Sequence, residues 1–267
     1  MRKLLFLYLP FMLYAFQSLG QNCDQVLASL VEAEISFATA SVEKGIRTAF
    51  LEYLADDAIV FLPEPINGKE GYGSRSESSA RLSWYPVYAD ISNSLDWGYT
   101  TGPYEVRSNP ADKQPAGAGF YLSVWKKQPD GEWKVAIDHG STYPVELIQP
   151  ETYQPAAATG ETGKGTAEGL LKKDTQRVQP YHDETLIYRA GAYPSRYEEL
   201  QIEPASNVVY TTLGHDISPA ADMAYTSGSY TLNNQGESET GYYLKVWKVL
   251  NGEWKLVAHN LVPNKKP

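Results

Sequence analysis

The chain carries one stretch twice: Asp90-Ile91-Ser92-Asn93-Ser94-Leu95-Asp96-Trp97-Gly98-Tyr99-Thr100-Thr101-Gly102-Pro103-Tyr104 recurs as Asp216-Ile217-Ser218-Pro219-Ala220-Ala221-Asp222-Met223-Ala224-Tyr225-Thr226-Ser227-Gly228-Ser229-Tyr230. Eight of the fifteen aligned positions are identical without a gap. The next segment recurs too, since 119–126 matches 241–248, and in each copy a turn and the residues Gly-Glu-Trp-Lys follow. Agreement in several ordered blocks predicts two homologous domains.

Each copy begins with helical periodicity and continues with strands. In the first copy, apolar residues recur at three- and four-residue steps from Leu27 to Val42, which predicts an amphipathic helix that Gly45 ends. The remaining elements expected in this copy are a short helix at 46–54, a strand at 58–62, a weak third helix at 69–82, and strands near 85–91, 97–106, 119–127 and 133–139. The second copy keeps the strands, but only 167–178 predicts a helix. The expected fold class is α+β, with helices covering one face of a curved antiparallel sheet in each domain.

The boundaries follow from composition. We expect domain 1 at 24–143 and domain 2, reduced in its helical part, at 166–263. Residues 144–165 are rich in Pro, Ala and Gly and carry few large apolar groups, which is typical of a linker.

Residues 1–20 have the features of a secretory signal peptide. Arg2 and Lys3 precede an apolar run at 4–16, and Ser18 and Gly20 supply the small residues of a cleavage site. The run is too short to span a bilayer of roughly 30 Å as a helix. We expect a mature chain that begins at Gln21, is secreted or periplasmic in a bacterial envelope, and does not insert into a membrane. The alternatives are a buried N-terminal helix and a lipid anchor on Cys23.

Composition excludes several classes of partner and cofactor. The 267 residues carry a formal net charge of -9, which argues against a nucleic-acid partner because such a partner requires clustered cations. A single cysteine cannot form an intramolecular disulfide. The four histidines show no metal-ligand spacing, and the chain has no nucleotide-binding or nucleophile-elbow motif, so no metal and no cofactor are indicated.

The residues also resemble a known family. The segment 50–58 leading into a strand, the Gly-Lys-Glu turn at 68–70, and the motifs at 98–104, 121–127 and 130–135 resemble the SnoaL-like branch of the nuclear transport factor 2-like superfamily. The resemblance covers nearly all of 24–143 and, more weakly at its start, 166–263. It implies a cone-shaped α+β barrel, on which the superfamily hosts isomerases, dehydratases, cyclases, hydrolases and non-catalytic binding modules. The tandem arrangement and the reduced second copy depart from the single-domain pattern.

Candidate chemistry centres on the end of the last strand of domain 1. Alternation from Trp133 places Val135, Ile137 and His139 on one face and Asp138 on the other. If the Trp133 face is the one under the helices, His139 points into the cone and could act as a general base, with Asp96 or Tyr99 as its partner. The matching position in copy two is Asn260, so this role would belong to domain 1 alone. The residues expected to line a ligand cavity are Phe61, Tyr99, Phe120, Trp133 and His139.

Ordinary structural roles compete with each of these assignments. His139 could be a strand-end histidine, Asp96 and its counterpart Asp222 could cap turns, and Tyr99 could pack in the sheet. Three functional hypotheses therefore remain. The first is an exported protein that binds a small, partly apolar ligand or a partner in the domain 1 cone. The second is an acid/base enzyme of the isomerase, dehydratase or hydrolase type, and the third is a structural pseudo-dimer whose two domains pair, either within one chain or in a homodimer.

Overall fold

The computed structural model describes residues 8–155, 163–199, 207–234 and 237–264. In the first half of the chain the helices are α1 (Tyr8–Lys44), α2 (Ile46–Tyr53) and α3 (Gly68–Gly73). The strands of this half are β1 (Leu54–Phe61), β2 (Pro65–Asn67), β3 (Arg81–Trp84), β4 (Tyr88–Ile91), β5 (Trp97–Arg107), β6 (Gly117–Lys127), β7 (Trp133–Tyr143) and β8 (Gln154–Pro155).

The second half has one α-helix within the described residues, α4 (Ala167–Asp174). Its strands are β9 (Tyr181–Arg189), β10 (Ser195–Arg196), β11 (Val208–Ile217), β12 (Met223–Asn234), β13 (Glu237–Leu250) and β14 (Glu253–Pro263). Two short 3-10 helices, η1 (Val145–Leu147) and η2 (Tyr197–Glu199), lie in the connections.

The two sheets repeat one strand order. The first runs β2-β1-β7-β6-β5-β4-β8, with β3 also paired to β5, and the second runs β10-β9-β14-β13-β12-β11. In each sheet the first long strand pairs in parallel with the last, β1 with β7 and β9 with β14, whereas the other long strands are antiparallel. The predicted α+β fold class of two tandem domains is therefore confirmed, but each sheet is mixed rather than wholly antiparallel.

Two helical predictions and the predicted linker can be compared with the structure. The first long helix ends at Lys44, because Gly45 adopts a φ of 93° that few other residues tolerate. The third helix, expected over 69–82, ends at Gly73, and 81–84 instead forms β3. The segment 144–165, expected to be a linker, contributes β8, which pairs with β4 at the edge of the first sheet.

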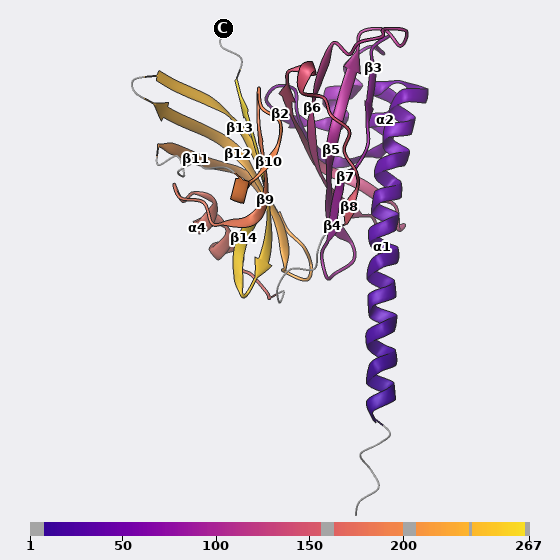
Figure 1. Ribbon diagram of the computed structural model, residues 1–267, viewed down its shortest axis with the longest axis vertical. Helices are drawn as coiled ribbons and strands as arrows, with labels where there is room; N and C mark the ends of the chain where they lie inside the picture. The colour runs from indigo at the N-terminus through magenta and orange to yellow at the C-terminus, as the bar shows by residue number, and fades with distance from the viewer. Residues whose placement is uncertain (1–7, 156–162, 200–206, 235–236, 265–267) are drawn as a thin grey trace, which may run out of the picture.

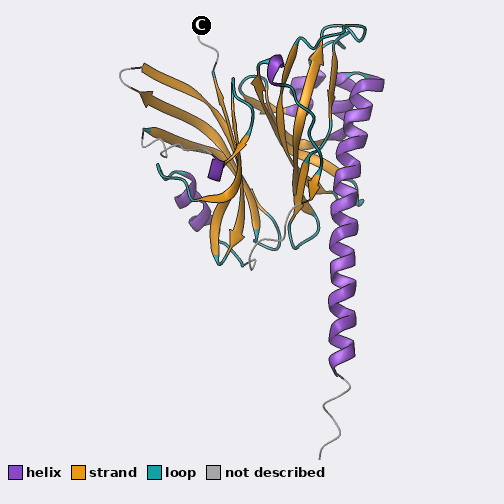
Figure 2. Cartoon of the chain, in the orientation of Figure 1, coloured by secondary structure: helices purple, strands orange, loops and turns teal. Residues whose placement is uncertain are grey.

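The elements stack in layers (Figures 1 and 2). Helices α1 to α3 cover one face of the first sheet, the opposite face packs on the second sheet, and α4 lies on the far face of the second sheet. The core between the sheets includes Trp97, Tyr99 and Leu122 from domain 1 and Tyr188 and Leu244 from domain 2. One face of each sheet is therefore covered by the other domain. A cone beneath helices can form on the opposite face of each sheet.

A β-bulge occurs at the same place in both sheets. In the first, Val124 pairs with Ile137 but Trp125 pairs with Val135, so Ala136 is an extra residue on β7. In the second sheet the equivalent extra residue is Val257 on β14. An extra residue interrupts the alternation of side chains, so residues after the bulge face opposite to the direction that simple counting gives.

Helix α1 extends well beyond the sheet that it covers (Figure 1). Among its residues with described side chains, contacts with the domain core begin at Val26, and residues 22–25 are exposed. Of the predicted signal peptide, residues 1–7 lie outside the described residues and 8–20 belong to this helix. None of the described helices is both long enough and apolar enough to cross a membrane.

Candidate functional site

Domain 1 contains a cavity of about 200 Å³ between its helices and the concave face of its sheet. The walls are mainly aromatic, with two carboxyl side chains among them. The lining residues are Glu34, Phe37, Phe50, Phe61, Tyr72, Leu82, Trp84, Tyr104, Tyr121, Ser123, Asp138 and Gly140. An apolar pocket with a few convergent polar groups is the usual form of a small-molecule site.

Glu34 on α1 is the deeper of the two carboxyl groups. It is fully buried and accepts hydrogen bonds from Trp84 Nε1 at 2.5 Å, Thr100 Oγ1 at 2.5 Å and Trp125 Nε1 at 3.0 Å. Burial raises the pKa of Glu34 to about 7, although these three donors favour its charged form. Because its oxygens are already engaged, Glu34 ties the helix to the sheet and shapes the base of the cavity.

Asp138 on β7 is the carboxyl group that can still accept further hydrogen bonds. Its Oδ1 accepts one hydrogen bond, from Ser123 Oγ at 2.7 Å, and the side chain is only partly buried by the protein. Burial raises the pKa of Asp138 to about 6, and the Ser123 hydrogen bond opposes that rise. At neutral pH this carboxylate is mostly ionised and can accept a hydrogen bond or a proton from a molecule in the cavity.

The expectation that His139 faces this cavity is wrong. Counting from Trp133 did not include the bulge at Ala136, and after it Asp138 faces the cone while His139 faces the second sheet. His139 is 3% exposed and stacks on Phe61 with ring centroids 3.9 Å apart. Burial lowers the pKa of His139 to about 3, so the imidazole is neutral and enclosed rather than poised for proton transfer.

The other predicted residues are dispersed. Tyr99 and Phe120 lie in the core between the two sheets, and Trp133 packs in the core under α1, where its Nε1 donates to Ser29. Asp96 occupies the turn before β5, and it lines neither this cavity nor the one in domain 2. The structure therefore does not bring His139, Asp96 and Tyr99 together, and of the expected lining residues only Phe61 borders the cavity.

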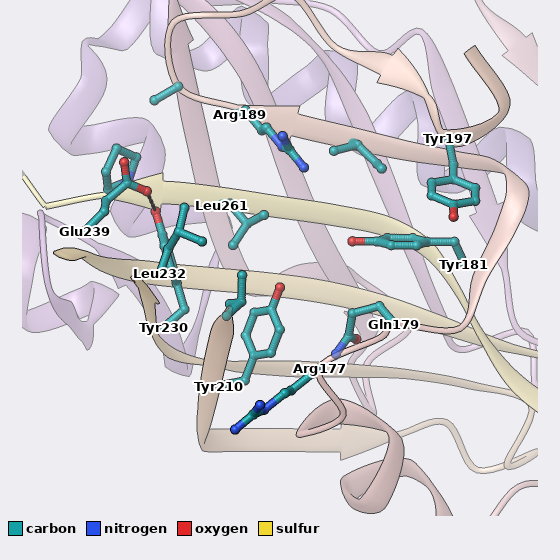
Figure 3. A pocket seen from close by; sticks show the side chains of 14 residues that line it. Arg177, Gln179, Tyr181, Arg189, Tyr197, Tyr210, Tyr230, Leu232, Glu239 and Leu261 are labelled. Carbon is teal, nitrogen blue, oxygen red and sulfur yellow. Dashed lines mark hydrogen bonds between the residues drawn. The ribbon is translucent and has the colours of Figure 1, made fainter. Parts of the chain in front are cut away.

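Domain 2 has a cavity of about 260 Å³ on the equivalent face of its sheet (Figure 3). Its walls combine tyrosines and aliphatic side chains with two arginines and one glutamate. The lining residues are Arg177, Gln179, Tyr181, Ile187, Arg189, Ala190, Tyr197, Val208, Tyr210, Tyr230, Leu232, Glu239, Leu261 and Pro263.

The two domains place different chemistry at equivalent positions. Asp174 on α4 is the counterpart of Glu34, because it accepts a hydrogen bond from Thr226, which corresponds to Thr100. Ser123 and Asp138, which face each other across β6 and β7, are replaced by Lys245 and His259. Lys245 Nζ lies 3.0 Å from Asp174 Oδ1 and both side chains are fully buried. An ion pair therefore occupies the part of domain 2 that in domain 1 borders the open cavity.

Sequence reasoning missed Glu34 and gave Asp138 the wrong face. Glu34 lies among the apolar positions of the first helix. A carboxyl group on a buried helix face requires hydrogen-bond partners, so its position could have indicated a buried polar site. The bulge left no such signal, because Ala136 is an ordinary strand residue. Among the described residues, no group of three or more His, Cys, Asp or Glu side chains is arranged to hold a metal ion.

Comparison with known proteins finds partial likeness to solved structures. No family model matches the chain, and no curated protein does. A protein of unknown function with a cystatin-like fold from Nostoc punctiforme is 20% identical, with a TM-score of 0.35, over 43% of this chain and 89% of that one. A ketosteroid isomerase-like protein from Erwinia carotovora atroseptica is 20% identical, with a TM-score of 0.34, over 46% and 97%. An NTF-2 like protein of unknown function from Shewanella oneidensis is 12% identical, with a TM-score of 0.29, over 35% and 93%. Each of these likenesses covers less than half of this chain.

Proposed function

We propose that the protein binds a small, partly apolar molecule in the domain 1 cavity and orients it by a hydrogen bond to Asp138. The main support is that the Asp138 carboxylate lies in a cavity wall that is otherwise largely aromatic. One of its oxygens accepts a hydrogen bond from Ser123. Trp84, Tyr72 and Tyr104 offer flat apolar faces to a ligand. A structural pseudo-dimer with filled cones would need neither this space nor a carboxylate that borders it.

A matched pair of probes tests the proposal. The alcohol 4-phenylbutanol can donate a hydrogen bond to Asp138, whereas its methyl ether cannot. In calorimetric titrations of the full chain we expect the alcohol to bind about tenfold more tightly than the ether, as a hydrogen bond to a charged group predicts. Asp138→Ala should abolish this difference, and Asp57→Ala, which removes an exposed carboxylate on β1, should preserve it. Equal binding of the two probes to the unmodified chain would reject the proposal.

A second candidate function, acid/base catalysis, rests on the same carboxyl group. A carboxylate whose pKa is raised to about 6 by burial is a stronger base than an exposed one and is still ionised at neutral pH. The reaction class is proton abstraction next to a carbonyl group. Its test is the exchange of the α-protons of 4-phenyl-2-butanone for deuterium in heavy water, followed by NMR. Catalysis requires faster exchange with the protein than with Asp138→Asn, and equal rates would leave binding as the better account.

We also propose that the chain is exported after cleavage behind Gly20. Support comes from the basic and apolar composition of 1–20 and from the exposure of 22–25, because among residues with described side chains the contacts of α1 begin only at Val26. Intact-mass measurement on the protein from the producing cell's envelope fraction should give a chain that starts at Gln21. A retained N-terminus would reject cleavage, and an added mass on Cys23 would identify a lipid anchor instead.

A further inference from the structure

The domain 2 cavity differs from the domain 1 cavity in the sign of its charge. Two guanidinium groups border it, Arg189 at the end of β9 and Arg177 in the segment after α4, and they come from opposite walls (Figure 3). Within the described ranges neither side chain has a hydrogen bond or an ion pair. The domain 1 cavity, in contrast, has two carboxyl groups and no cation among its lining residues.

The other polar groups of this cavity are mostly hydrogen-bond donors. Burial raises the pKa of Tyr181 and of Tyr210 well above the ordinary value, so both hydroxyl groups stay protonated. The hydroxyl of Tyr197 borders the same space, and its ring stacks on Tyr181 with centroids 4.5 Å apart. Glu239 is the one lining carboxylate, and it is engaged by Tyr230, whose hydroxyl donates to it at 2.8 Å.

The base of the cavity is apolar. Ile187, Val208, Leu232 and Leu261 present aliphatic side chains between the tyrosine rings. Unpaired guanidinium groups recognise carboxylates by paired hydrogen bonds, and aliphatic and aromatic walls bury a hydrocarbon body. From this arrangement we propose that domain 2 holds a second binding site, which takes a small organic carboxylate with an apolar or aromatic body. Arg189 and Arg177 bind the carboxylate group, and the apolar base accepts the remainder of the molecule.

The buried interior of domain 2 adds no net charge to this cavity. Lys245 and Asp174 neutralise each other deep in domain 2, where Tyr210 covers the ammonium group with its ring centroid 3.5 Å from Nζ. Consequently, among the described residues the charged groups that border the open part of the cavity are Arg177, Arg189 and Glu239. Their sum is one positive charge, which favours a monovalent anion.

The test uses the full chain and 4-phenylbutyrate, with the neutral 4-phenylbutyramide as its match, in calorimetric titrations at low salt. We expect the carboxylate to bind at least about tenfold more tightly than the amide, the factor typical of a hydrogen-bonded charge pair. Arg189→Gln and Arg177→Gln should each remove most of this preference and leave amide binding unchanged. Lys172→Gln, which removes an exposed positive charge from α4 outside the cavity, should leave the preference intact.

Two further variants separate this site from its alternatives. Glu239→Gln should strengthen carboxylate binding because Glu239 is the only carboxylate that borders the cavity within the part of the chain that the structure describes. Asp138→Ala should leave carboxylate binding unchanged, so failure of the function proposed for domain 1 would not affect the result. Equal affinity of the unmodified chain for the carboxylate and the amide would overturn the proposal. A carboxylate preference that survives both arginine substitutions would overturn it too. Should one of the two arginine variants misfold, the other arginine variant alone provides the comparison.

Discussion

The hydroxyl of Ser92 in domain 1 donates a 2.5 Å hydrogen bond to the carboxylate of Asp222 in domain 2. The same carboxylate accepts the backbone N–H of Asn93 at 2.9 Å and the hydroxyl of Ser218 at 2.8 Å. Asp222 therefore joins its own turn to the equivalent turn of the other domain. Its counterpart Asp96, at the identical position of the repeat, has an oxygen that is buried without a hydrogen bond among the described residues.

This asymmetry predicts different costs for two equivalent substitutions. Asp222→Ala leaves several buried donors unpaired and should lower the free energy of unfolding by about 2–4 kcal/mol. Asp96→Ala removes no such acceptor and should cost less than about 1 kcal/mol. Urea denaturation followed by tryptophan fluorescence measures both. Equal losses would show that the two aspartates serve the same purpose, which the hydrogen bonds of Asp222 argue against.

The architecture was predictable from the sequence because the repeated positions include residues that the packing of the strands requires. Gly102 and Gly228 show this: an added Cβ at either would lie 2.0 Å from a backbone oxygen, so the close strand approach requires glycine in both copies. The interior of the cone was less predictable. Alternation is a reliable guide only within an uninterrupted strand, and the bulge at Ala136 exchanged the faces of Asp138 and His139. Glu34 is 91 residues away in the sequence from its partner Trp125 on β6, and local sequence patterns carry no information over that separation.

Acid should destabilise the protein partly through His139. The unfolded histidine takes up a proton near its ordinary pKa of 6.5, whereas burial lowers the pKa of the folded one to about 3. Between these values the unfolded state binds more protons, so the free energy of unfolding falls as the pH falls from 6.5 towards 3, by up to about 1.4 kcal/mol per pH unit.

The replacement His139→Phe removes that dependence and keeps a ring against Phe61. We expect the variant to match the unmodified chain near pH 8 and to become progressively more stable than it below pH 6.5. Chemical denaturation across pH 4 to 8 measures the difference. His215→Phe, which changes an exposed histidine on β11, should leave the pH dependence of the parent chain as it is. A constant offset between His139→Phe and the parent would contradict the argument.

Asp138 should act in the opposite direction. Burial raises its folded pKa to about 6, above the ordinary value of 3.8, so on raising the pH the unfolded state loses its proton first. The stabilising protonated form is therefore lost as the pH rises from about 4 to about 6. Asp138→Asn cannot ionise and keeps an acceptor for Ser123, so it should exceed the parent in stability by about 1–2 kcal/mol at pH 7 and by less at pH 4.5.

Thermal and urea unfolding at these two pH values check the prediction. Asp57→Asn, an exposed substitution on β1, is the matched control and should show no such gain. A gain in stability that accompanies loss of the alcohol preference would identify Asp138 as a group retained for binding at a cost in stability. Loss of stability at both pH values would instead indicate that the Ser123 hydrogen bond outweighs the burial of charge.

The ion pair of domain 2 should behave as a single unit. Lys245→Met leaves the carboxylate of Asp174 buried without its cation, which should lower the free energy of unfolding by about 3–5 kcal/mol. The double variant Lys245→Met with Asp174→Asn removes the unpaired charge and keeps one acceptor oxygen, which can serve either Thr226 or Tyr243, so it should recover part of that loss. A double-mutant cycle in urea measures the coupling, with Lys172→Met on the exposed face of α4 as the control. Additive losses in the cycle would mean that the two charges act independently, and the interior of domain 2 would then tolerate a lone carboxylate as domain 1 tolerates Glu34.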